Sequence, residues 1–219
     1  MKWIASSLLP LAALASPGLA SAQLISDPTG DWFTSMPTSG PAVAYDGAKN
    51  GDMDVIGVSA TFNTSTNTFA IVAQMNGNIG TTATARYVWG VNTGSNATPF
   101  ATNMGLSGVS FSQTISVTPG AGGAATVSGV AGATASYSGA MLTLLVPSTS
   151  LTSTNGFKPT DYTWNLWPRD TTAGLKQANS DFAPDNANIA TAAVPEPSSL
   201  ALMMLGGAGL LVWRRRKNS

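Results

Sequence analysis

The 219-residue chain contains no cysteine and no histidine, and its one glutamate is Glu196. Disulfides, imidazole or thiolate metal ligands and nucleophiles activated by a histidine base are therefore excluded. Basic residues are also few: between residues 23 and 194, nine aspartates stand against five lysines and arginines, a net charge of −4. Such a region lacks the positive surface that nucleic acid requires, so we expect no nucleic-acid partner.

The first 22 residues have the pattern of an export signal. Lys2 supplies a positive charge, residues 3–15 are apolar, and residues 20–22 are the small residues that a signal peptidase needs. We predict a signal peptide over residues 1–22, cleaved before Gln23. The alternative is an N-terminal membrane anchor, which Pro10 and the shortness of the apolar run disfavour.

Residues 195–219 form a tail of three parts. As a helix, its apolar span at 198–213 would reach about 24 Å at about 1.5 Å per residue, short of the roughly 30 Å hydrocarbon core, so it crosses only with local thinning of the bilayer. Basic residues stay on the cytoplasmic side, so we expect a short transmembrane helix with its C-terminus inside. A simple tail anchor is the alternative. The polar parts are Pro195, Glu196 and Pro197 before the span, and Arg214, Arg215, Arg216 and Lys217 after it.

This order of Pro-Glu-Pro, short apolar span and terminal arginine cluster resembles the PEP-CTERM sorting signal of Gram-negative bacteria. The resemblance implies export, a transient stay in the inner membrane, and recognition at residues 195–197 by an exosortase. It further implies delivery to the cell surface or to an extracellular polysaccharide matrix.

Residues 23–194 read as one secreted domain of short strands. Residues 54–62 and 68–75 alternate apolar and polar side chains on either side of the turn-forming run 63–67, which predicts a hairpin. No amphipathic helix is evident, so we predict an all-β, antiparallel β-sandwich, with a barrel as the competing closure. The small-residue stretch 119–139 is expected to form weak edge strands. Further strands are expected at 85–91, 109–117, 125–130, 134–137, 141–146 and 162–167.

Several short motifs of this domain are similar to the DOMON and family 9 carbohydrate-binding β-sandwich domains. They are Asp-Pro-Thr-Gly-Asp at 27–31, Gly-Asp-Met-Asp-Val at 51–55, Tyr-Val-Trp-Gly-Val-Asn-Thr-Gly at 87–94, Leu-Leu-Val-Pro at 144–147 and Asp-Phe-Ala-Pro-Asp at 181–185. The resemblance implies a secreted sandwich fold but transfers no binding residue.

Aspartates gather in turn-like segments at both ends of the domain. Calcium takes six to eight oxygen ligands from such loops, and the two ends share an ion if the first and last strands are neighbours. The ordinary alternative is that each aspartate hydrogen-bonds its own turn. We therefore treat a structural calcium ion as a hypothesis and expect no other cofactor. Its candidate ligands are Asp27, Asp31, Asp52, Asp54, Asp181 and Asp185.

Aromatic rings stack on sugars, which makes Trp32 and Trp164 candidate glycan contacts. Trp164 and Trp167 lie on opposite faces of one predicted strand, which weakens the idea of a single sugar platform. A core role is the stronger interpretation of these rings, because large aromatic side chains dominate the cores of sandwiches.

The sequence favours a non-enzymatic protein of the cell surface or matrix. A carbohydrate-binding module that attaches to matrix glycans is the alternative. A secreted hydrolase using an aspartate pair is disfavoured, because nothing in the sequence marks such a pair.

Overall fold

A computed structural model describes residues 23–194. Among these residues, none of the helices has the length and apolar character needed to cross a membrane. The predicted signal peptide, the Pro-Glu-Pro motif, the apolar span and the basic cluster lie outside the described residues.

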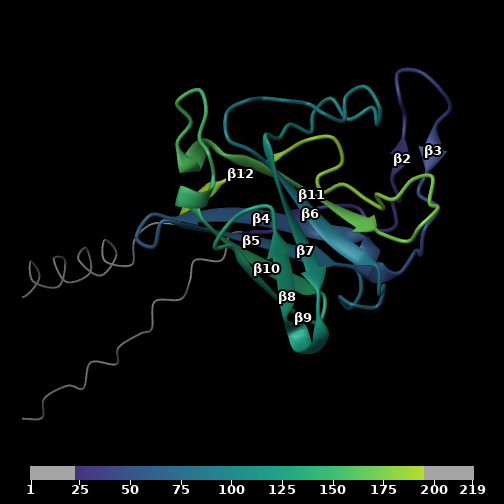
Figure 1. The fold of residues 1–219 in the computed structure, drawn as a ribbon, viewed down its shortest axis with the longest axis horizontal. Helices are drawn as coiled ribbons and strands as arrows, with labels where there is room; N and C mark the ends of the chain where they lie inside the picture. The colour runs from purple at the N-terminus through teal and green to yellow at the C-terminus, as the bar shows by residue number, and fades with distance from the viewer. Residues whose placement is uncertain (1–22, 195–219) are drawn as a thin grey trace, which may run out of the picture.

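Two β-sheets face each other and account for most of the regular structure (Figure 1). The first sheet has the order β1-β4-β5-β10-β9, with β13 also pairing to β4. The second has the order β12-β11-β6-β7-β8. All pairings between these strands are antiparallel except that of β13 with β4. The prediction of an all-β antiparallel sandwich is therefore confirmed.

The first sheet consists of β1 (Ile25–Ser26), β4 (Val55–Asn63), β5 (Thr68–Met75), β9 (Thr134–Ser138), β10 (Met141–Pro147) and β13 (Ala192–Val194). The second consists of β6 (Ala85–Asn92), β7 (Gln113–Pro119), β8 (Ala125–Ser128), β11 (Thr163–Asp170) and β12 (Ile189–Ala190). A separate ribbon pairs β2 (Thr34–Ser35) with β3 (Val43–Ala44). Four short 3-10 turns complete the described part: η1 (Gly51–Met53), η2 (Ala121–Gly123), η3 (Ser148–Ser150) and η4 (Pro159–Asp161).

The alternation in the sequence sets which face of each strand is buried. In β5, every second residue is buried, beginning with Phe69 and ending with Met75. The predicted hairpin is confirmed, since β4 and β5 pair from Asn63 and Thr68 outward. Because the period of a strand is two, this register sends one whole set of apolar side chains into the space between the sheets.

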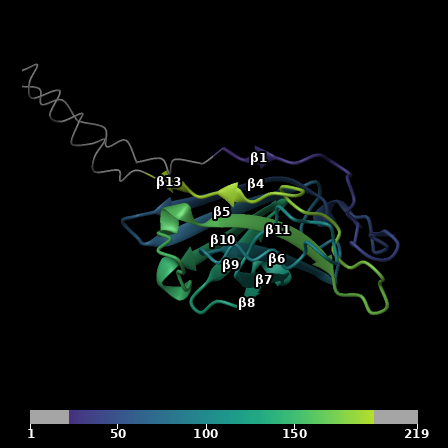
Figure 2. The ribbon, with the colours of Figure 1, turned by 90° about the horizontal axis from the view of Figure 1, so that it is seen from above.

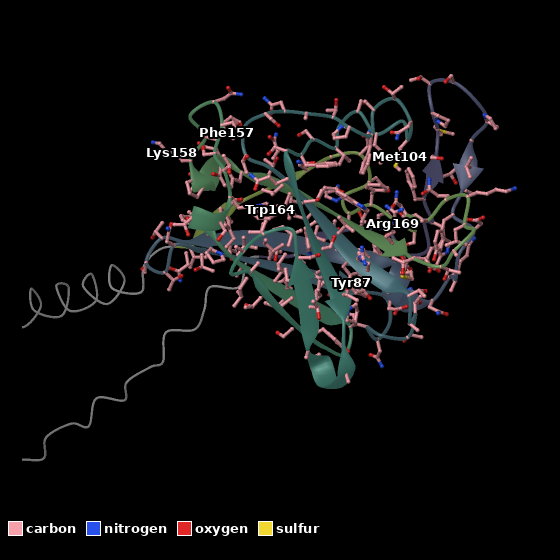
Figure 3. All side chains as sticks on the ribbon, viewed as in Figure 1. Tyr87, Met104, Phe157, Lys158, Trp164 and Arg169 are labelled. Carbon is pink, nitrogen blue, oxygen red and sulfur yellow. The ribbon has the colours of Figure 1, made fainter. Side chains whose placement is uncertain are left out.

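The core between the sheets is rich in aromatic rings. Phe69 packs edge-on against Trp164 at 5.2 Å between ring centroids and stacks on Tyr162 at 5.6 Å. Trp89 and Leu144 are also fully buried in this cluster. Figure 3 labels Trp164 and Tyr87 in the middle of the domain, among the strands of both sheets.

A second, smaller apolar cluster covers the outer face of the five-stranded sheet. Trp167 points away from Trp164, as the alternation predicts, and packs with Phe182, Leu106 and Val109. The predicted strand at 109–117 begins only at Gln113, because Val109 belongs to the covering segment and is buried in this cluster. A long connection therefore closes over this sheet and shields its outer face.

The small-residue stretch 119–139 forms edge strands, as expected. Strand β8 ends the five-stranded sheet and β9 ends the six-stranded sheet. A single bridge between Ala124 and Ser136 connects the two at this corner. The sandwich is therefore joined along one edge without closing into the barrel that we considered as the alternative.

The two ends of the described chain lie side by side. Strand β1 pairs with β4 at Gly57 and Val58, and β13 pairs with the same edge of β4 from Thr61 to Asn63. Figure 2 shows β1 and β13 next to β4 on one side of the molecule. The first and last strands are thus neighbours, which was the condition for aspartates from both ends of the domain to meet.

Candidate functional site: a buried aspartate cluster

The loop that contains Asp27 and Asp31 is fixed to the start of β4. The backbone N–H of Asp27 donates to the carbonyl of Ile56 at 3.1 Å, which extends the pairing of β1. Gly30 has φ of +78°, a conformation that favours glycine. Its N–H donates to both carboxylate oxygens of Asp54, at 3.1 and 3.0 Å. Asp54 thus holds this five-residue loop closed against the sheet.

Asp181 approaches the same place from the C-terminal segment. It is buried, with 1% of its surface exposed. Its Oδ2 accepts the N–H of Val55 at 2.8 Å, and its Oδ1 accepts the N–H of Phe182 at 2.7 Å. The neighbouring Ser180 donates its hydroxyl to the carbonyl of Met53 at 2.6 Å. These bonds give the Asp181 carboxylate a fixed position next to β4.

The three carboxylates of Asp27, Asp31 and Asp181 meet at this point. One oxygen from each lies within 4.8 Å of the other two. Three of the carboxylate oxygens, Oδ2 of Asp27 and both oxygens of Asp31, are shielded from solvent and accept no hydrogen bond from the protein. Burying an ionised carboxylate without a partner is costly, so this arrangement requires protons, water or a cation.

Electrostatics reflect the crowding of like charges. Burial, followed by the charges of Asp181 and Asp185, raises the pKa of Asp27 from 3.8 to about 8. Burial also raises the pKa of Asp181 to about 8, against the lowering effect of the Val55 N–H. The pKa of Asp31 is raised as well, chiefly by burial. Without a cation, the cluster therefore retains protons at neutral pH.

The other aspartates take separate places. Asp54 positions the loop and also accepts the side-chain amide of Asn76 at 2.9 Å. Asp185 is exposed but close enough to raise the pKa of Asp27 and Asp31. Asp52 is not part of the cluster, because its carboxylate accepts the N–H and hydroxyl of Thr82, both at 2.7 Å. The structure therefore does not bring Asp52 together with the other predicted calcium ligands.

The tryptophans do not form a sugar platform. Trp164 is fully buried, and its indole N–H donates to the hydroxyl of Thr191 at 3.0 Å, so its prediction as a glycan contact is wrong. Trp32 is half-buried; it stacks on Tyr45 at 5.7 Å, and the ammonium of Lys49 lies 5.8 Å from its ring centroid. Of the two predicted sugar contacts, only Trp32 therefore remains partly accessible, and Tyr45 already stacks on one face of its ring.

The sequence did not reveal that Asp54 holds the 27–31 loop by accepting a hydrogen bond from it. Its hydrogen bond to Gly30 joins residues 24 positions apart, and no local pattern marks such a pair. The glycine between two aspartates was the only local signal, because glycine is the residue that most readily adopts the positive φ of such a turn.

Comparison with known proteins adds one finding to this geometry. Residues 193–217 match the family model of the PEP-CTERM protein-sorting motif. This motif implies export and sorting to the surface by exosortase-type machinery. The tail of the chain therefore carries a PEP-CTERM sorting motif, as its Pro-Glu-Pro sequence predicted. Neither the curated proteins nor the solved structures searched contain a match. The resemblance of the domain to DOMON and family 9 carbohydrate-binding domains stays a prediction.

Proposed function

We propose that this protein is a non-catalytic component of the cell surface or extracellular matrix, delivered there by its C-terminal motif. The observation that carries the non-catalytic part is the shielding of the aspartate cluster. Both oxygens of Asp31 and one oxygen of Asp27 are shielded from solvent, although each residue as a whole is half-buried. A general acid or base must come within hydrogen-bond distance of its substrate, and these atoms meet only protein.

The absence of histidine, cysteine and any second glutamate supports the same proposal. The carboxylate pair of a glycosidase lies on either side of an open cleft, about 5–9 Å apart. The cluster of Asp27, Asp31 and Asp181 instead lies under the 27–31 loop and is tied to the backbone of β4. Such an arrangement suits a structural role.

The delivery route we propose begins with the signal peptide at 1–22 and signal peptidase. The tail then holds the domain at the inner membrane with its C-terminus in the cytoplasm, until an exosortase acts at Pro195, Glu196 and Pro197. The described chain supports an outward presentation, since β1 and β13 leave the domain at one edge. The remaining surface then faces away from the membrane.

Attachment to matrix glycans is the second candidate, and Trp32 is the one predicted sugar contact that is not buried. A single ring supports weak stacking at most, because sugar platforms combine several rings with hydrogen-bonding groups. The first proposal is therefore favoured.

Cell fractionation tests the delivery step. In cells that contain the sorting enzyme, we expect the wild type at the surface or in the matrix, and the Glu196→Ala variant in the inner-membrane fraction. Ser198→Ala, two residues away, is the matched control and should travel like the wild type. Equal distribution of all three proteins would contradict sorting through this motif.

A substrate screen tests the non-catalytic role. We expect the purified full chain to show no turnover of glycosides, esters or peptides. Turnover that disappears in Asp27→Asn would overturn the proposal and establish the hydrolase that we disfavour.

A further inference from the structure

We propose that Asp27, Asp31 and Asp181 bind a calcium ion that fastens the N-terminal segment to the sandwich. The proposal goes beyond the sorting function, which does not require an ion. It stands on the meeting of three carboxylates together with the buried, unpartnered oxygens among them.

The spacing fits the ion. Two oxygens bound to the same calcium at about 2.3–2.6 Å lie at most about 5 Å apart. The three carboxylate oxygens lie within 4.8 Å of one another, so each can reach a common centre with little movement. Ligation by oxygen alone is typical of a hard cation, and calcium tolerates the irregular geometry that three separate side chains provide.

The unpartnered oxygens point to a ligand at this place. Asp181 has hydrogen bonds on both oxygens, and these orient it. Asp31 has none on either oxygen, although both are shielded from solvent. A carboxylate that only capped its own turn would accept a backbone N–H. Neither oxygen of Asp31 accepts an N–H from another residue, which leaves most lone pairs of this side chain free for a cation.

The local charge favours a cation over any other occupant. Asp54 lies beside the three carboxylates, because it accepts the N–H of Gly30 in the same loop, so four acidic side chains lie close together here. One divalent ion neutralises two of these carboxylates and removes most of their mutual repulsion. The groups that orient the ligands are also present: Asp54 closes the loop through Gly30, and the N–H of Val55 aligns Asp181.

The ion would supply a cross-link that the sequence otherwise lacks. Strand β1 has only two residues, both exposed, so sheet pairing alone holds the N-terminal segment weakly. Asp181 is 150 positions further along the chain than Asp31. A metal that joins them stabilises the folded state, because the unfolded chain does not hold these carboxylates together and binds the ion only weakly.

The test is thermal unfolding of the full chain in detergent, followed by tryptophan fluorescence. The protein is first treated with EDTA, and calcium or magnesium chloride is then added. Extracellular calcium modules have dissociation constants of about 0.1–1 mM, so about 10 mM calcium lies well above the dissociation constant. We expect the melting temperature to rise by about 3–10 °C with calcium, and by less with magnesium.

Asp31→Asn is the decisive variant, because its oxygens have no hydrogen bond to lose. We expect it to melt at the same or a higher temperature than the wild type in EDTA, since a buried like charge is removed, and to show no shift with calcium. Asp46→Asn, an exposed aspartate outside the cluster, is the matched control and should keep the full shift. Calorimetric titration should count one calcium per wild-type chain.

Three results would overturn the proposal. The first is a wild-type melting temperature that calcium does not change, which would mean that the cluster is held by shared protons or water. The second is a calcium shift of equal size in Asp31→Asn, which would place any bound ion elsewhere. A larger shift with magnesium than with calcium would reject calcium as the ion.

Discussion

The carboxylate of Asp54 accepts the backbone N–H of Gly30 through both of its oxygens, at 3.1 and 3.0 Å. This contact fixes the loop that presents Asp27 and Asp31 and also explains why the loop needs a glycine, since Gly30 has φ of +78°. A side chain at position 30 would meet no atom within 4 Å, so backbone conformation is the only cost there.

These two residues should therefore respond differently to substitution. We expect Gly30→Ala to lower the free energy of unfolding by about 1 kcal/mol, the cost of a left-handed residue with a side chain. Asp54→Ala should cost about 2–3 kcal/mol, because it removes the acceptor of both Gly30 and Asn76. Urea unfolding measures both values. A larger loss for Gly30→Ala than for Asp54→Ala would mean that the carboxylate is not what holds the loop.

The stability of the metal-free protein should depend on pH in an unusual direction. The pKa values of Asp27 and Asp181 are raised from 3.8 to about 8, so the folded state binds more protons than the unfolded state between these two pH values. The stabilising contribution is complete below about pH 4 and is lost as the pH rises through about 8. In EDTA, we expect a higher melting temperature at pH 5 than at pH 9.

The control for this pH dependence is Asp27→Asn, which should flatten the profile because one of the two raised groups is gone. Added calcium should remove much of the loss at high pH, because the ion binds the deprotonated carboxylates. A metal-free protein that becomes more stable from pH 5 to pH 9 would contradict the raised pKa values.

The two tryptophans that we considered for glycan binding should separate stability from surface function. Trp164→Phe loses the hydrogen bond to Thr191 and leaves a gap beside Phe69, so we expect a loss of about 1–3 kcal/mol. Trp32→Ala, at a half-buried position, should cost less than Trp164→Phe. Urea unfolding gives both values, and binding to a glycan array should be absent in the wild type. Saturable glycan binding that Trp32→Ala removes would establish the carbohydrate-binding alternative.

The strands were predictable where burial alternates along the chain. The sequence places one strand at 68–75, which is where β5 lies, because one face of β5 is buried and the other partly exposed. The two-residue strands β1, β2, β3 and β12 were not predictable, since two residues show no period and pair only because their neighbours bring them together. The start of β7 was missed because Val109 is apolar for a different reason: it packs under Trp167.

The sequence predicted that aspartates form the candidate site, but not which of them lie close together. That aspartates from the two ends meet depends on long-range contacts near the start of β4, where β1 pairs with Gly57 and Val58 and Asp181 accepts the N–H of Val55; no local pattern specifies these contacts. The sequence also does not distinguish an aspartate that could bind a cation from one that hydrogen-bonds a neighbouring loop. Asp52 and Asp54 lie two positions apart in one motif, yet Asp52 binds Thr82 and Asp54 binds Gly30. Long-range contacts decide such roles.

The sorting motif begins inside the folded domain, which should limit the rate of sorting. The family match starts at residue 193, whereas β13 extends to Val194 and pairs with Phe62 and Asn63 of β4. Pro195 thus follows the sheet with no linker. An enzyme that binds an extended segment must approach the domain closely or separate β13 from β4. Insertion of a short Gly-Ser linker between Val194 and Pro195 should therefore speed the appearance of the protein at the cell surface in a pulse-chase experiment.

The same linker placed after Gly174, in an exposed loop, is the matched control and should leave the rate unchanged. Slower delivery with the linker at residue 194 would mean that the sorting enzyme uses the folded edge of β4 and β13 as part of its recognition surface. Unchanged delivery would mean that β13 separates from β4 faster than the enzyme acts, because a three-residue parallel pairing at a sheet edge has little stability of its own.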